Sequence, residues 1–297
     1  MNLLPIAAVE RDTGIGKDTL RVWERRYAFP QPTRDAKGER LYPAEQVDKL
    51  RLLRRLLDQG HRPGNIVGEP LETLLALVDA RSEAPPAAAN AQIEALIEAV
   101  RLHHSAELRA ALQQHLVKLG LQRFAAEVVA PLSDAVGEAW LQGRIGVAEE
   151  HLFTEQVQNL LRSAIGSLAP SGGTPRMLLT TLPGEEHILG LLMVEATLIP
   201  EGVHCVSLGT QTPLADIAEA ARGGGFDIVA VSFSAAFPAR QAVAALRQLR
   251  AQLLPGIALW AGGAALRGKR RPIDGVCQID PLADVLAALA AWRAAQP

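Results

Sequence analysis

Residues 177–190 read MLLTTLPGEEHILG, an apolar run that passes into a charged loop and then into a helix. The apolar run at 177–182 predicts a buried β-strand, and Pro183-Gly184 marks the turn that ends it. The helical pattern that follows continues to about residue 199. A strand, a short loop and a helix in this order form the first unit of an α/β fold.

The same alternation continues toward the C-terminus. Strands are expected at 204–207, 227–233, 257–260 and 275–278, with helices after Pro213, over 238–253 and over 282–293. Strands that alternate with helices pair in parallel, because each helix returns the chain to the same edge of the sheet. The sequence therefore predicts a doubly wound, Rossmann-like (flavodoxin-like) α/β domain.

Two further zones precede this domain. Residues 91–168 contain a single proline, and their leucines recur at helical spacing, which predicts a four-helix bundle. Residues 84–89 contain only Pro and Ala, and residues 171–175 read SGGTP. Both stretches lack periodicity, so we expect linkers there. The predicted domains are residues 1–80, 91–170 and 174–297.

The overall composition restricts the class of protein. The 297 residues include 30 Lys and Arg against 32 Asp and Glu, so the total charge favours no particular partner. Two cysteines are too few for a disulfide framework. No apolar run is long enough for a membrane span, and the N-terminus lacks the pattern of a secretory signal. We therefore expect a cytoplasmic protein with no membrane partner.

Basic residues are concentrated near the N-terminus. Residues 17–55 contain eleven Lys and Arg but six Asp and Glu. A short helix from Ile6, a glycine turn at 14–16 and a basic helix at 17–27 are the parts of a helix-turn-helix, whose second helix enters the major groove of DNA. The basic loop at 34–40 then predicts a wing that reaches the phosphates.

Residues 19–27, TLRVWERRY, and 38–42, GERLY, closely resemble the winged helix-turn-helix of the MerR family. The resemblance implies binding to double-stranded promoter DNA, whereas the alternative is that the helix arginines only solvate an exposed face. Trp23, between those arginines, is expected to pack in the core. The residues expected at the DNA are Lys17, Thr19, Arg21, Arg25, Arg26, Tyr27, Arg34, Lys37, Arg40 and Tyr42.

The loop after the first strand of the α/β domain contains Glu185 and His187, two residues apart. Ligands of such sheets bind at the carboxyl ends of the strands. A histidine there can bind a metal through one ring nitrogen while the carboxylate holds the other. Gly190, at the start of the next helix, is expected to leave room for a bulky ligand.

Two further motifs follow along the chain. Forty-one residues separate Gly190 from the sequence Ser232-Phe233-Ser234, and twenty-seven more precede Gly262-Gly263. This series resembles the cobalamin-binding fold of methionine synthases and base-off mutases. Two positions depart from that pattern, because Glu185 replaces an aspartate and Ser234 replaces a leucine or threonine.

The resemblance to the cobalamin-binding fold implies a role for each motif residue. His187 would be the lower cobalt ligand, and Glu185 would be its partner. Ser232 and Ser234 would line the slot for the displaced dimethylbenzimidazole. Gly262 and Gly263 would leave room for the nucleotide tail.

The helical zone contains Trp140, nine intervening residues and then Glu150-His151. Together with the N-terminal motif, this spacing resembles the CarH/LitR family of cobalamin-dependent photoreceptor repressors. The resemblance implies that the three side chains cover the upper cobalamin face and enclose a 5′-deoxyadenosyl group, so that adenosylcobalamin is the expected cofactor. Leu141 stands where photoreceptors with a bis-histidine product have a histidine, and leucine cannot bind cobalt.

These resemblances predict a transcriptional repressor rather than an enzyme. Adenosylcobalamin, and light that cleaves its Co–C bond, would control promoter binding by a homo-oligomer, a tetramer in the dark. One alternative is a cobalamin-sensing regulator that does not respond to light. The other is a corrinoid methyl-carrier protein, which would share the helical cap and α/β domain but would have no use for a DNA-binding domain.

Overall fold

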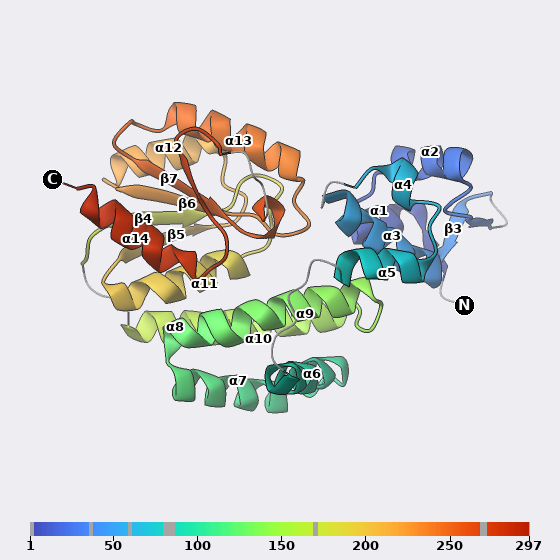
Figure 1. Ribbon diagram of the computed structural model, residues 1–297, viewed down its shortest axis with the longest axis horizontal. Coiled ribbons are helices and arrows are strands. Elements are labelled where there is room, and N and C mark those ends of the chain that lie inside the picture. The colour runs from blue at the N-terminus through green and yellow to red at the C-terminus, as the bar shows by residue number, and fades with distance from the viewer. Residues whose placement is uncertain are drawn as a thin grey trace. The chain divides into compact units, whose positions relative to one another are not determined.

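The computed structural model describes residues 3–35, 38–58, 61–79, 87–168, 172–267 and 272–296. The chain forms two compact units, and Figure 1 labels most of their helices and strands. The first unit contains residues 1–90 and 138–146, and the second contains residues 91–137 and 147–297. Among the described residues, no helix combines the length and the apolar character needed to cross a bilayer.

The first unit begins with the predicted winged helix-turn-helix. α1 (Ile6–Thr13) ends at Gly14, whose φ of 66° reverses the backbone, and α2 (Lys17–Tyr27) follows after the glycine turn. The wing is an antiparallel sheet in the order β1-β3-β2. Its strands are β1 (Leu3–Pro5), β2 (Thr33–Arg34) and β3 (Arg40–Pro43), of which β1 was not predicted from the sequence.

Three more helices complete this part of the chain, α3 (Ala44–Asp58), α4 (Pro63–Ile66) and α5 (Leu71–Asp79). Leu20 of α2 packs in the core with Leu50 and Leu53 of α3, and all three are fully buried. Trp23 is only 4% exposed and belongs to the same core. The expectation that Trp23 packs inside the domain is therefore confirmed.

The helical zone forms the predicted bundle. α8, η1 and α9 follow one another without a break, so that residues 121–141 form one long helix with a π-helical turn inside it. Within the described residues, this long helix and three others make up the bundle. The elements are α6 (Ala87–Arg101), α7 (Ser105–Leu119), α8 (Leu121–Phe124), the π turn η1 (Ala125–Val129), α9 (Ala130–Leu141) and α10 (Val147–Leu168).

The C-terminal zone forms a five-stranded parallel sheet in the order β5-β4-β6-β7-β8. This is the strand order of flavodoxin-like folds, so the predicted α/β class is confirmed. Every residue of the central strand β6 is buried, as expected for a strand covered on both faces. The strands are β4 (Arg176–Thr180), β5 (His204–Gly209), β6 (Ile228–Ser232), β7 (Ala258–Gly262) and β8 (Val276–Ile279).

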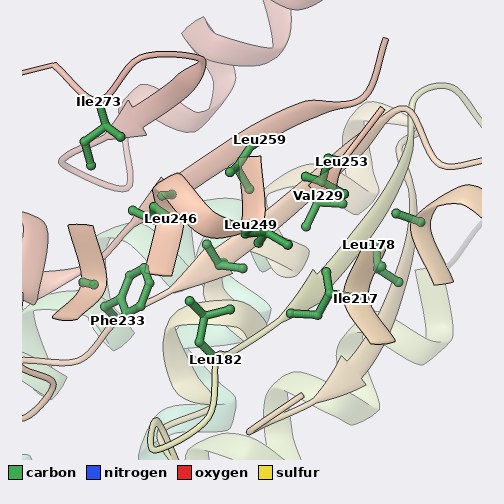
Figure 2. Close-up of a cluster of buried hydrophobic side chains, with 14 of the residues drawn as sticks. Leu178, Leu182, Ile217, Val229, Phe233, Leu246, Leu249, Leu253, Leu259 and Ile273 are labelled. Atoms are coloured by element: carbon green, nitrogen blue, oxygen red, sulfur yellow. The ribbon is translucent and has the colours of Figure 1, made fainter. Parts of the chain in front are cut away.

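Helices cover both faces of the sheet. They are α11 (Leu189–Leu198), α12 (Leu214–Gly223), α13 (Ala239–Gln252) and α14 (Asp284–Ala294). On one face, Val229 belongs to a buried cluster with Leu246 and Leu249 of α13 (Figure 2). On the other face, Leu191 of α11 and Leu289 of α14 share a second core. The sheet is therefore held rigidly between two apolar layers.

The bundle and the α/β domain pack together through α11. α8, η1 and α10 all lie against this helix. Gln122 of α8 donates from Nε2 to the Thr197 carbonyl and to Glu201 Oε1, both at 2.9 Å. Because α11 begins directly after the loop that contains His187, this contact places one side of the bundle near that loop.

Candidate functional site

The loop between β4 and α11 holds His187 and Glu185 in a fixed relation. Glu185 Oε1 accepts the backbone N–H of His187 at 3.0 Å and lies 2.7 Å from Nδ1 of the same residue. Ser234, just beyond β6, donates its backbone N–H to Glu185 Oε2 at 2.7 Å and its hydroxyl at 2.9 Å. Since Glu185 is only 1% exposed, these donors replace the water that its carboxylate lacks.

The pKa values of the pair show which partner carries the proton. Burial raises the pKa of Glu185, but hydrogen bonds from His187 and Ser234 lower it more, so the net shift is downward. The hydrogen bond to Glu185 raises the pKa of His187, against the effect of burial. An ionised carboxylate only accepts hydrogen bonds, so Nδ1 of His187 carries the proton that faces Glu185.

The other ring nitrogen of His187 is open. Among the described residues, none is hydrogen-bonded to Nε2, and the side chain is 55% exposed. A neutral imidazole with Nδ1–H held by a carboxylate presents an oriented lone pair at Nε2. It offers one ligand from the protein, which suits a metal that is already held by a macrocycle.

Gly190 and Ser232 lie against each other where α11 begins and β6 ends. A Cβ atom on residue 190 would clash with Ser232 Oγ, and Ser232 is 9% exposed. The missing side chain of Gly190 therefore leaves room for the Ser232 hydroxyl. The expectation that Gly190 also leaves room for a ligand stays a prediction.

Gly262 and Gly263 allow a close approach of backbone segments at the ends of β6, β7 and β8. A Cβ atom at residue 262 would lie 2.8 Å from the Ile279 carbonyl oxygen. At residue 263, where φ is 103°, it would clash with the Phe233 carbonyl. The predicted motifs follow three strands of the parallel sheet, β4, β6 and β7. They therefore lie together at the carboxyl ends of the strands.

On the bundle side, Glu150 and His151 lie in the first turn of α10. Glu150 Oε2 is 2.7 Å from His151 Nδ1, and Oε1 accepts the Thr154 hydroxyl at 2.8 Å. The charge of Glu150 also contributes to the raised pKa of His187. Glu150 therefore acts on His187 electrostatically from the bundle.

Trp140 has a partner that the sequence did not predict. Its ring centroid lies 4.8 Å from Cζ of Arg51 in α3, and both residues belong to the first unit. Leu141, the next residue, ends α9 and is half-buried. Since 88 residues lie between Arg51 and Trp140, no local pattern could have revealed this contact.

The candidate DNA-binding face lies on α2 and the wing. Arg21, Arg25 and Arg26 of α2 are exposed, as is Thr19. Arg21 is paired with Asp18 within its own helix, and two further predicted cations also have partners within the domain. Arg34 donates from Nη1 to the Gly38 carbonyl at 2.8 Å, and Lys17 Nζ lies 3.1 Å from Glu10 Oε2.

Four predicted DNA contacts need separate comment. Tyr42 is fully buried and its hydroxyl has no partner among the described residues, so the expectation that it reaches DNA is wrong. Tyr27 is half-buried against the core. Arg40 donates from Nε to Glu24 Oε2 at 2.8 Å, which ties the wing to α2. Lys37 lies outside the described residues.

Comparison with protein families finds the same three parts. The MerR HTH family regulatory protein matches residues 4–68. The B12 binding domain matches twice, through one form at residues 92–164 and another at residues 175–278. The first match contains the helix-turn-helix and wing, the second falls within the helical bundle, and the third contains most of the motif residues at the sheet edge.

The similarity to individual relatives extends over most of the chain. The HTH-type transcriptional repressor CarH of Myxococcus xanthus is 32% identical over 259 residues, 86% of either chain. The repressor CarA of the same organism is 30% identical over 77% of this chain and 76% of its own. The monomethylamine corrinoid protein of Methanosarcina barkeri matches with a TM-score of 0.55 at 17% identity, over 66% of this chain and 96% of its own. That last match shows the fold alone.

Proposed function

Because this chain belongs to the MerR-family transcriptional regulators with B12-binding domains that include CarH and CarA, we propose that it is a repressor controlled by adenosylcobalamin and light. The observation that carries the proposal is the His187–Glu185 pair. Nε2 of His187 is open, and its Nδ1 is fixed by the buried carboxylate of Glu185. The charge of Glu150, in the bundle, contributes to the raised pKa of His187.

In this proposal, His187 would hold the cobalt of the cofactor through Nε2. Glu185 holds the ring by accepting the Nδ1 proton, and Ser234 fixes Glu185 in turn. Ser232, Ser234, Gly262 and Gly263 would border the space for the displaced base and the nucleotide tail. When bound, adenosylcobalamin supplies a Co–C bond that light breaks, and this chemistry belongs to the cofactor.

The upper face would be covered by Trp140, Glu150 and His151. An indole can pack on the adenine ring, and the Glu150 carboxylate can accept hydrogen bonds from the ribose hydroxyls. These contacts exist only with the deoxyadenosyl group, so they favour adenosylcobalamin over methylcobalamin. Leu141 offers no ligand, so water or another side chain would fill the upper position after illumination.

Control of DNA binding would follow from linkage between cofactor and assembly. A cofactor that binds one assembly state more tightly raises the population of that state. Helix-turn-helix proteins read two half-sites as oligomers, and we propose a homo-tetramer in the dark with cofactor bound. Light would remove the deoxyadenosyl contacts and thereby favour release of the promoter.

One experiment tests these statements together. The full chain is titrated in the dark with adenosylcobalamin or methylcobalamin, and its absorption spectrum and binding to its own promoter fragment are recorded before and after green light. We expect a base-off, His-on spectrum, tighter binding of adenosylcobalamin, and light-dependent loss of promoter binding. Promoter binding that ignores both cofactor and light would contradict the proposal.

The DNA-binding face is tested in the same assay. Arg25→Ala should weaken promoter binding and reduce the salt slope by about one, because one phosphate contact is lost. Arg109→Ala, which removes an exposed arginine that bonds Gln156 in the bundle, serves as the matched control. An unchanged slope for Arg25→Ala would remove this residue from the interface.

Leu141 favours a second candidate, a cobalamin-sensing regulator without a light response. Such a protein would bind its promoter according to cofactor concentration alone, and green light would change the spectrum without releasing DNA. A corrinoid methyl carrier is a weaker alternative, because the MerR-like domain would have no role in it.

A further inference from the structure

Arg51 of α3 lies in a closed cluster of charges within the first unit. Its Nη2 donates to Asp12 Oδ2 in α1 and its Nη1 donates to Asp48 Oδ1 in α3, both at 2.6 Å. The Arg51 side chain is 12% exposed and that of Asp12 is 10% exposed. The two carboxylates bind the edge of the guanidinium and so hold its plane in place. Its flat face is left accessible to another side chain.

Trp140 occupies that face. Its ring centroid lies 4.8 Å from Cζ of Arg51, within the range of a cation–π contact. The turn after α9 adds a second point of contact, because a Cβ atom at Gly143 would lie 2.9 Å from Asp48 Oδ2. Residues 138–146 thus meet α3 both through an indole and through a closely approaching backbone.

The turn geometry supports this close approach. Gly143 has a φ of 69°, which favours glycine, and its N–H donates to the Trp140 carbonyl at 3.0 Å. The N–H of Arg144 donates to the Ala139 carbonyl at 2.9 Å. These bonds form a helix-ending turn that fixes Gly143 relative to Trp140. The indole and the Asp48 contact therefore belong to one docked unit.

We propose that Arg51 is a docking site for Trp140 that competes with the cofactor for the same indole. The inference rests on the proposed function, in which Trp140 covers the deoxyadenosyl group. In the cofactor-free chain the indole is docked on the DNA-binding unit, and cofactor binding withdraws it. By linkage, docking weakens cofactor binding, and the cofactor loosens the hold of residues 138–146 on α3 to the same extent.

The first test alters the face of the docking site and keeps its charge. Arg51→Lys retains a cation near Asp12 and Asp48 but loses the planar surface on which the indole stacks. We expect adenosylcobalamin to bind the full chain about two- to tenfold more tightly, because a competing contact of cation–π strength is removed. Arg101→Lys, at an exposed arginine paired with Glu98, should leave the affinity unchanged. Unchanged or weaker binding by Arg51→Lys would overturn the proposal.

The second test does not depend on the stability of the Arg51 variant. Asp48→Cys and Gly143→Cys are combined with Cys277→Ser, which removes the exposed native thiol. A Cβ atom at residue 143 would lie 3.0 Å from the present Asp48 Cγ, so a disulfide is within reach. Burial raises the pKa of Cys205 to about 12, which keeps that thiol unreactive.

We expect this disulfide to form under mild oxidation in the cofactor-free chain and to form severalfold more slowly with saturating adenosylcobalamin. The oxidised chain should bind the cofactor less tightly, and reduction should restore the affinity. A disulfide that forms at the same rate with and without the cofactor would overturn the proposal. The absorption spectrum of the unmodified chain with cofactor tests the proposed function separately, because absence of the His-on spectrum would contradict that function and not the docking site.

Discussion

In the described part of the chain, two pairs have a histidine Nδ1 that lies 2.7 Å from a glutamate oxygen, and they differ in burial. In the α/β domain, Glu185 is 1% exposed beneath His187. In the bundle, the side chains of Glu150 and His151 are 28% and 74% exposed. Ser234, from beyond another strand, holds Glu185, whereas the other bond to Glu150 comes from one turn along its own helix.

The difference shows that a hydrogen-bond distance alone does not define a site. The buried carboxylate is held by groups distant in sequence, so His187 keeps one orientation whatever is bound. The exposed pair is held locally and contributes little on its own. A permanent metal ligand needs a buried, fixed partner such as Glu185. An exposed, locally held pair such as Glu150 and His151 suits contact with a group that the protein holds only for a time, as proposed for the deoxyadenosyl group.

The largest expected effect comes from removing the ligand of the buried pair. His187→Ala should weaken cobalamin binding by about 100-fold or more, because loss of a partner that only orients a ligand already costs about 10- to 100-fold. The His-on absorption spectrum should be lost as well. His104→Ala is the matched control, since that exposed histidine pairs with Glu107 in α7. Unchanged affinity and spectrum would exclude His187 as the ligand.

The next effect comes from the carboxylate that orients His187. Glu185→Gln should weaken binding by about 10- to 100-fold, because the amide cannot accept every donor that now meets the carboxylate. The adjacent exposed Glu186 provides the control, and Glu186→Gln should change affinity little. Equal effects of the two substitutions in a cobalamin titration would mean that burial of Glu185 has no bearing on the ligand.

A third change would place a side chain that can bind cobalt at the end of α9, in the helical bundle. Leu141→His should slow cofactor release after illumination by about tenfold if the new ligand contributes about 1.4 kcal/mol. Release is measured by gel filtration at set times after green light, with Leu141→Ala as the control for lost packing. A bis-histidine spectrum in the unmodified chain would contradict the assignment of Leu141 as the reason for fast release.

The smallest effect is expected at the exposed pair. His151→Ala should change adenosylcobalamin affinity by less than about fivefold, because exposed pairs of this kind contribute little. Isothermal titration in the dark measures the change, and methylcobalamin serves as the reference ligand. A loss as large as that of Glu185→Gln would show that burial does not distinguish the two pairs.

Much of the fold could be predicted because its signals are local. Alternating strands and helices predicted the parallel sheet, and the glycine turn with the basic helix predicted the helix-turn-helix. Strand β1 could not be predicted, because three residues carry no periodicity and its pairing of Leu4 with Tyr42 joins distant parts of the chain. That pairing, together with α3, also helps to explain why Tyr42 is buried.

The candidate site was predicted to a similar extent. Glu185, His187 and Ser234 meet because parallel strands end at one edge, a consequence of topology that motif spacing could reveal. The partner of Trp140 could not be predicted, since its contact with Arg51 depends on tertiary packing. The closeness of Gly190 to Ser232 could not be predicted either, because a sequence shows a missing side chain but not which neighbour lies against it.

The π turn η1 also determines the angular position of everything that follows it in the long helix. An α-helix advances about 100° per residue, and a π turn amounts to one inserted residue. Ala125 and Val129 of η1 are fully buried, and η1 packs against α11. Deleting one residue there would restore regular winding and rotate residues 130–141 by about 100° relative to α8. The face of the helix on which residues 130–137 lie is thus set upstream, by one inserted residue at η1.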